Sequence, residues 1–199
     1  MQQKTTEPST TVLEQELDRI SRAQLAGKSQ QEVQDFKRVK KNYVRVLGSI
    51  QYKLDAQNMS YNELRDEKHK SSRLGKFLTQ EGKPRPAQGF EAHAIVSGGD
   101  PRAYDLRVEM ALKKVRIDDT DNGCWLPGSA KDALGSRYPN AVPHRRLHNF
   151  RYYNWLTNIA LYKADRLSEP EFRAKLNTSR DMLQSGAVAG LVLNPEVPK

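Results

Sequence analysis

Three of the chain's four histidines fall within residues 91–155, and their spacing could place them around one metal ion. His144 and His148 are four residues apart, so a helix would stack their rings on one face, one turn apart. His93 lies upstream in an apolar segment, shortly before a Gly-Gly pair. Neutral imidazoles are common metal ligands. Because histidines at this spacing are also frequent as surface or packing residues, the pair needs support from its surroundings.

Two short strands and one helix are expected to position these histidines. Residues 90–96 suit a strand, which the pair Gly98-Gly99 ends. Residues 118–122 form an acidic turn, and residues 124–126 suit a second strand. A proline opens residues 143–159, and it fits the first position of a helix because it has no amide hydrogen to lose there. The expected order is therefore strand, turn, strand and helix.

This order resembles the HNH endonuclease fold, and more specifically the branch of the HNH/endonuclease VII superfamily named for its Ala-His-His motif. The motifs that carry the resemblance are Ala92-His93-Ala94-Ile95-Val96, Asn122-Gly123-Cys124-Trp125-Leu126-Pro127, and His144 and His148 followed by Tyr152-Tyr153. Each motif is common alone, whereas all of them in this order are more specific. The resemblance covers about residues 88–163 and does not cover residues 1–85. It implies an α+β fold, mostly helical, with a small ββα-metal catalytic unit.

The resemblance also implies roles for individual residues. His93 would be a metal ligand from the first strand, and His144 and His148 would be ligands from the helix. Asn122 would fix the turn by hydrogen bonds to the backbone and so orient the first strand. Asn122-Gly123 can equally be a simple hairpin turn, which needs no function. The cofactor would be one divalent ion, and zinc, magnesium, manganese and nickel all remain open.

The implied chemistry is metal-assisted hydrolysis of a phosphodiester. The ion would polarise the phosphate and stabilise the departing oxygen, while a histidine removes a proton from the attacking water. Three arginines beside the histidines, Arg145, Arg146 and Arg151, could hold phosphate oxygens bidentately. They could also be solvated helix residues.

Residue 94 departs from the family motif, which has there a second histidine that acts as general base. This chain has Ala94. Three interpretations follow: a substitution introduced to disable a toxic nuclease, a naturally inactive relative, or a base supplied by another group. The intact remainder of the motif favours the first interpretation. Activity is then expected to be lower by roughly 10²–10⁴-fold, which is the contribution of a positioned base.

Composition agrees with a protein that meets a polyanion, and equally with a soluble protein that has an accidental excess of lysine. The formal net charge is +9, and 37% of the residues are hydrophobic, which is enough for a modest core. No apolar run approaches the roughly 20 residues that cross a bilayer. The N-terminus has no basic-then-apolar signal pattern. Cys124, the single cysteine, lies in an apolar stretch and is expected to be a small buried hydrophobe rather than a nucleophile.

Five segments are expected along the chain. Residues 1–9 would be a disordered N-terminus, residues 10–81 a helical region, residues 82–89 a linker, residues 90–163 the ββα nuclease unit, and residues 164–199 a C-terminal helix and tail. Two prolines and two glycines within residues 82–89 mark the linker.

Helix starts are expected in both the N-terminal and the C-terminal part of the chain. They lie at Thr10 or Thr11, at Ser29, at Ser60 and at about Ser168, so that residues 10–81 form a helical hairpin or three helices. A basic face runs along the helix after Ser29 and could follow a phosphate backbone, although a solvated face is the favoured interpretation. It consists of Lys37, Arg38, Lys40, Lys41 and Arg45.

Two classes of function fit the sequence. The first is an endonuclease toxin domain with little sequence specificity, whose substrate is a nucleic acid, by resemblance DNA. That resemblance implies a longer secreted effector and delivery without a signal peptide into the cytoplasm of a target cell. It also implies a cognate immunity protein, and it implies no membrane contact.

The second class of function is a non-catalytic nucleic-acid- or protein-binding module with a structural metal site. Structural sites normally have four ligands, whereas three histidines leave one position open, which favours the enzyme.

Overall fold

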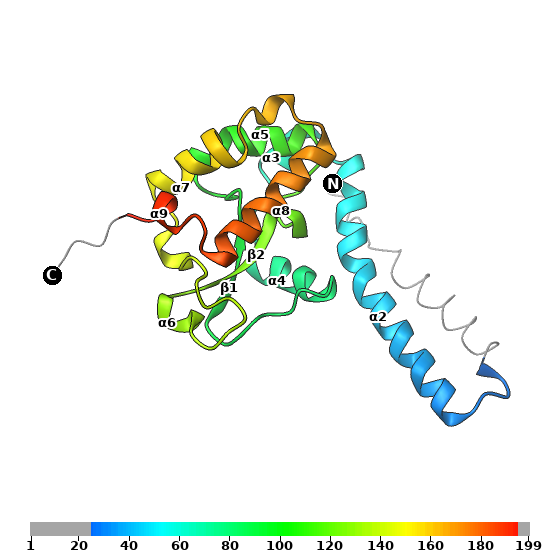
Figure 1. Ribbon diagram of the computed structural model, residues 1–199. Helices are drawn as coiled ribbons and strands as arrows, with labels where there is room; N and C mark the ends of the chain where they lie inside the picture. Colours follow the sequence, from blue (N-terminus) through cyan, green and yellow to red (C-terminus); the bar gives the residue numbers. More distant parts are fainter. Residues whose placement is uncertain (1–24, 195–199) are drawn as a thin grey trace, which may run out of the picture. The chain divides into compact units, whose positions relative to one another are not determined.

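The computed structural model describes residues 25–194, with only the backbone described for residues 41–45. The helix start expected at Thr11 and the segment 1–9 lie outside the described residues. The chain divides into two units after Gly48. In the first unit, the described residues form the first part of helix α2 (Gln30–Asp55) (Figure 1). The predicted helix start at Ser29 is confirmed, and Ser29 and Glu32 exchange hydrogen bonds there. Lys37 and Arg38 on this helix are exposed.

The second unit is an α+β fold, as the sequence predicted, with the end of α2 and a series of short helices around one small sheet. Its α-helices and strands, in chain order, are α3 (Tyr61–Arg65), α4 (Ser71–Gln80), β1 (Phe90–Ala94), α5 (Tyr104–Leu112), β2 (Gly123–Pro127), α6 (Ala130–Ala133), α7 (Phe150–Trp155), α8 (Glu169–Ser185) and α9 (Ala189–Val192). Shorter helical turns are η1 (Ala56–Asn58), η2 (Pro101–Ala103), η3 (Thr120–Asn122), η4 (His144–Arg146), η5 (Leu156–Ala160) and η6 (Ala164–Arg166). Among the described residues, no helix is both long and apolar enough to span a membrane.

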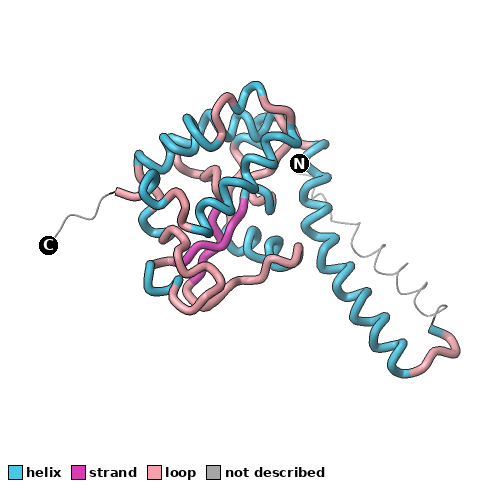
Figure 2. Tube along the Cα trace, viewed as in Figure 1, coloured by secondary structure: helices cyan, strands magenta, loops and turns pink. Residues whose placement is uncertain are grey.

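The sheet consists of β1 and β2, which pair antiparallel and run side by side through the middle of the second unit (Figure 2). Ala94 pairs with Gly123 and His93 with Cys124. Successive side chains of a strand point to opposite faces, so Ala92 and Ala94 share a face that His93 does not. Both strands predicted from the sequence are confirmed, with β1 two residues shorter than expected.

Helix α4 covers the face of the sheet that carries Ala92 and Ala94. A buried cluster joins the helix to both strands, and its members are Leu74, Leu78, Phe90, Ala92, Ala94 and Trp125. Close packing explains why residue 123 is a glycine, since a Cβ on this residue would lie 2.5 Å from Cδ1 of Leu74. Because α4 belongs to this cluster, residues 82–89 connect two parts of one packed unit. The division after Gly48 therefore lies well before the linker that the sequence suggested.

The opposite face of the sheet packs on the larger core. This core combines Ile95, Val96, Cys124 and Leu126 from the sheet region with apolar residues of α5, α7 and α8. The helix starts predicted at Ser60 and Ser168 are confirmed, each by a reciprocal capping box with the glutamate three residues later. The last long helix, α8, ends where Gly186 adopts a left-handed conformation at φ +78°.

Two of the predicted local structures are wrong. Asn122-Gly123 does not form a hairpin turn, because Gly123 is extended at φ −123° and opens β2. Residues 143–159 do not form one α-helix. The α-helix starts at Phe150, because the side chain of Asn149 caps it by accepting from the amide of Tyr152. His144 therefore lies on the 3₁₀ turn η4, and His148 lies in the loop just before the cap.

Candidate metal centre

The fold brings the three predicted ligand histidines together. The ring centroids of His93 and His144 are 4.8 Å apart, those of His93 and His148 are 5.7 Å apart, and those of His144 and His148 are 5.4 Å apart. One nitrogen of each ring lies within 4.8 Å of the others. β1 supplies His93, while the 3₁₀ turn and the following loop supply the other two. The loop geometry replaces the helix face in bringing His144 and His148 together.

A carboxylate fixes the orientation of His144. Its Nδ1 lies 2.6 Å from Oε2 of Glu91, which comes two residues before His93 on β1. A carboxylate at this position accepts a hydrogen bond, so Nδ1 carries the proton and Nε2 keeps its lone pair. The arrangement of carboxylate, histidine and metal is common in metalloproteins because it fixes the tautomer and raises the basicity of the ligand.

A buried tyrosine fixes His93 in the same way. The hydroxyl of Tyr152 donates to the carbonyl of Ile95 at 2.7 Å, so it accepts from Nε2 of His93 at 3.1 Å. The Nδ1 atom of His93 is then the unprotonated nitrogen. Burial lowers the pKa of His93 well below its ordinary value, and the nearby His144 and His148 lower it further. His93 is therefore neutral at physiological pH, as a metal ligand must be.

The third histidine is oriented by the neighbouring tyrosine. Nδ1 of His148 lies 3.1 Å from the hydroxyl of Tyr153. A hydroxyl can both donate and accept, so this contact orients the ring in either tautomer. Burial lowers the pKa of His148, and His144 lowers it further, which also favours the neutral form.

Two ring nitrogens of the cluster face each other. Nε2 of His148 lies 3.3 Å from Nε2 of His144. A metal ion bound here requires an unprotonated nitrogen from each ring. A donor set of three imidazoles fits a divalent ion, and nitrogen ligands suit zinc or nickel better than magnesium. Three ligands leave coordination positions for water and substrate, as in catalytic sites.

The side chain of Asn122 binds three backbone groups of two chain segments. Its Nδ2 donates to the carbonyls of Ile117 and Val96 at 2.8 and 3.2 Å, and its Oδ1 accepts from the amide of Val96 at 2.8 Å. The side chain is fully buried. These hydrogen bonds hold the chain just beyond β1 against the turn that leads into β2. Asn122 thereby fixes the strand end from which His93 projects.

Ala94 lies on the other face of β1 from His93. It is 4% exposed and belongs to the cluster beneath α4. A histidine at this position would add an imidazole to a packed cluster. The place where the family motif carries its base is therefore filled here by apolar packing.

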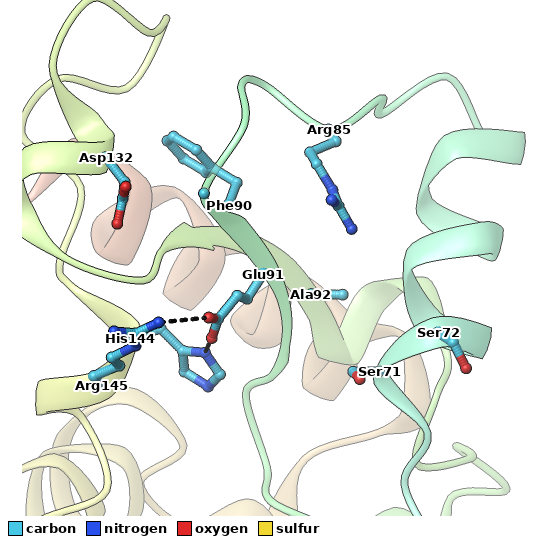
Figure 3. A pocket seen from close by; sticks show the side chains of 10 residues that line it. Ser71, Ser72, Arg85, Phe90, Glu91, Ala92, Asp132, His144 and Arg145 are labelled. Atoms are coloured by element: carbon cyan, nitrogen blue, oxygen red, sulfur yellow. Dashed lines mark hydrogen bonds and ion pairs between the residues drawn. The ribbon is translucent and has the colours of Figure 1, made fainter.

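Of the three candidate phosphate ligands, Arg145 alone lines the cavity beside the histidines. This cavity has a volume of about 510 Å³, and Figure 3 shows Glu91 lying between Arg145 and His144. The side chain of Arg145 is 74% exposed. Arg146 instead donates to the carbonyl of Asn194, and Arg151 to the carbonyls of Gly190 and Leu191. The latter two arginines hold the C-terminal segment.

The single thiol is buried, as the sequence predicted. Cys124 is 1% exposed, and burial raises its pKa to about 12. A thiol in this state is a poor nucleophile.

The residues that orient the ligands do not stand out in the sequence. Glu91 shares a strand face with His93, since the two are separated by one residue, and this alternation is the signal that could have identified it. Tyr152 and Tyr153 were noticed as part of a motif, but no role followed from their spacing. Their positions depend on where α7 begins, and that start was predicted seven residues too early.

Comparison with known proteins gives one match. A family model described as a nuclease family of the HNH/ENDO VII superfamily with conserved AHH matches residues 74–185, which is more than half of the chain. The matched range contains the three candidate ligand histidines, Asn122 and Ala94, and it also includes most of α4 and all of α8. No curated protein and no solved structure matches the chain.

Proposed function

The chain belongs to the AHH nuclease family of the HNH/ENDO VII superfamily, and on this basis we propose that it is a metal-dependent endonuclease that cuts DNA with little sequence specificity. The observation that carries the proposal is a cluster of three histidines, whose ring nitrogens lie within 4.8 Å of one another, beside an exposed arginine. Nothing in the chain resembles a base-reading motif, and a charge of +9 favours sequence-independent contacts with phosphates.

The residues that would hold the ion are His93 through Nδ1, and His144 and His148 through Nε2. A divalent ion bound there would polarise a phosphodiester oxygen and stabilise the charge that develops on it. Arg145 is placed to hold a further oxygen of the same or the adjacent phosphate, because its guanidinium lines the cavity that contains His144. Glu91, Tyr152 and Tyr153 keep the three rings in ligand orientation.

The alanine at residue 94 bears on the rate of this reaction. The motif places a general base there, and a positioned base contributes roughly 10²–10⁴-fold. We expect the chain with Ala94 to cut more slowly than a relative with the complete motif. Whether the alanine was introduced or is natural does not change this expectation.

The biological setting proposed for the chain is that of a toxin. In this proposal the nuclease is part of a longer secreted effector, acts in the cytoplasm of a target cell, and is blocked by a cognate immunity protein. The proposal rests on the resemblance of the motifs. An exposed cavity that contains both Arg145 and a ligand histidine would give an inhibitor protein access to the site.

The test is cleavage of a supercoiled plasmid by the chain and by Ala94→His, with magnesium, manganese, nickel or zinc and with a chelator. A His93→Ala/His148→Ala double variant is the control for a contaminating nuclease. Metal-dependent nicking that the control lacks supports the proposal. Folded, metal-loaded protein that cuts neither DNA nor RNA in either form would overturn it and favour a binding module with a structural metal.

A further inference from the structure

The fourth histidine lies outside the proposed metal ligands and forms a pair with a buried carboxylate. Nδ1 of His69 hydrogen-bonds Oδ1 of Asp118. The side chain of His69 is 26% exposed, whereas that of Asp118 is fully buried. Among the described residues, Nε2 of His69 has no hydrogen-bond partner. The carboxylate therefore holds the proton on Nδ1, and Nε2 keeps its lone pair.

Asp118 is itself held in place by several hydrogen bonds. Its Oδ2 accepts from the backbone amide of Lys70 at 3.0 Å and from Nε of Arg73 at 2.6 Å. Arg73 also donates to Glu67 at 3.0 Å, and Glu67 accepts from Arg116 at 2.6 Å. A buried carboxylate with this many donors has no freedom to turn away from His69. The ring of His69 is thus oriented in the way that a carboxylate orients a catalytic histidine.

His69 lies at the end of α4 that borders the candidate site. It comes two residues before Ser71, which lines the same cavity as Glu91 and His144. Its backbone packs on the turn that follows β1, where a Cβ on Gly98 would lie 2.7 Å from the Cβ of His69. The charge of His69 is near enough to lower the pKa of His93 and of His148, after the larger effects of burial and the other histidines.

His69 also stands directly before the helix that covers the face of β1 where the motif's base is missing. Ala94 belongs to the cluster under that helix. An imidazole nitrogen with a lone pair and a carboxylate that fixes the ring are properties that the missing histidine would have supplied.

We propose that His69, oriented by Asp118, is the general base that activates water in this chain in place of a histidine at residue 94. This inference rests on the proposed nuclease function and adds a catalytic residue to it. Water attacks phosphorus, and its proton passes to Nε2 of His69. The bond between phosphorus and one ester oxygen breaks, the electron pair leaves with that oxygen, and the oxygen takes a proton from solvent. The imidazolium of His69, stabilised by Asp118, then returns its proton to solvent.

The test compares plasmid cleavage by the unaltered chain, His69→Asn, Ala94→His and the neighbouring control Lys68→Asn, all loaded with the most active metal. Asparagine keeps a donor for Asp118 but offers no base. We expect His69→Asn to lower kcat by roughly 10²–10⁴-fold, with metal affinity and melting temperature unchanged. Added imidazole should restore cleavage to His69→Ala, which a purely structural role of His69 would not allow.

The outcomes separate this inference from the proposed function. If the unaltered chain cuts and His69→Asn cuts equally well, His69 is not the base, although the nuclease function stands. If only Ala94→His cuts, the function again stands and the inference is overturned. If no form cuts while all bind metal and stay folded, both fail.

Discussion

The Nδ1 atom of His144 lies 2.6 Å from Oε2 of Glu91, so a strand residue orients a metal-binding ring that is 53 positions away in the sequence. The same carboxylate lies 3.7 Å from the guanidinium of Arg145. One acidic side chain therefore connects the candidate ligand set with the candidate phosphate ligand. The contact makes Glu91 the first residue to change when the metal site is tested.

Replacing Glu91 by alanine should weaken metal binding without unfolding the chain. Loss of a carboxylate that orients a ligand histidine typically lowers metal affinity about 10–100-fold. Glu91→Gln should have a smaller effect, because the amide oxygen can still accept from Nδ1 of His144. Isothermal titration with zinc measures the metal affinity of both variants. Asp165→Ala, which removes an exposed acid elsewhere, is the control. Equal zinc affinity in Glu91→Ala and the control would show that this contact does not support a metal ligand.

Tyr152→Phe should affect stability as well as metal binding. The hydroxyl of Tyr152 satisfies both the carbonyl of Ile95 and Nε2 of His93, and all three groups are buried. Removing it leaves buried polar groups without partners, at about 1–3 kcal/mol each. Urea denaturation with and without zinc should show a destabilised apo protein and a smaller stabilisation by metal. A variant as stable as the parent in both conditions would contradict the assigned tautomer of His93.

Asn122→Ala should be strongly destabilising whether or not metal is present. Three backbone groups lose their partner, two carbonyls and the amide of Val96, and the side chain is fully buried. A loss of at least about 2 kcal/mol is expected from unsatisfied buried groups of this kind. Thermal unfolding followed by circular dichroism checks it. A metal-free protein that unfolds at the parent's temperature would mean that Asn122 does not hold the end of β1.

The sequence predicted well what depends on local patterns. The capping boxes at Ser60 and Ser168 require residues only three positions apart, and both helices begin where those pairs place them. The two strands followed from short apolar runs. The histidines were correctly brought together, although the reason was wrong, since Asn149 delays the helix and a 3₁₀ turn carries His144.

Contacts between distant segments were not predictable from one sequence. His69 and Asp118 are 49 positions apart, and no local pattern connects them. The packing of α4 on the sheet depends on Leu74 fitting beside Gly123, so residues 82–89 looked like a boundary although both sides belong to one core. Glu91 could be placed on the face of His93 by alternation, but its partner could not be identified.

Acid should destabilise the second unit through the ion pairs of Arg173. Burial disfavours ionisation of Asp121, but hydrogen bonds from Arg173 and Asn177 outweigh it, so the pKa of Asp121 lies below its ordinary value. A carboxyl whose pKa is lower in the folded than in the unfolded state stabilises the fold above its unfolded pKa, about 3.9. This stabilisation is lost as the pH falls through the folded pKa.

Arg173→Met should therefore be destabilised at pH 7, and its stability should fall less steeply than the parent's below pH about 4. The loss at pH 7 should be roughly 3 kcal/mol, because Asp119 is buried and loses a partner at 2.7 Å. Urea unfolding at a series of pH values measures both the loss of stability at pH 7 and the dependence of stability on pH. Parallel curves for the two proteins would show that these ion pairs do not govern acid stability.

The three arginines near the histidines should separate into one that binds substrate and two that hold structure. Arg145 is exposed at the cavity, so Arg145→Ala should weaken binding of a DNA duplex uniformly across sequences. The salt slope, which is the slope of the logarithm of the binding constant against the logarithm of the salt concentration, should become smaller in magnitude by about one. Arg151 binds the carbonyls of Gly190 and Leu191, so Arg151→Ala should lower the melting temperature and change the salt slope less. Fluorescence anisotropy at several salt concentrations, with the ligand variant His93→Ala to prevent cleavage, measures the binding. The assignment fails if Arg151→Ala reduces the slope as much as Arg145→Ala does, because both arginines would then contact phosphate.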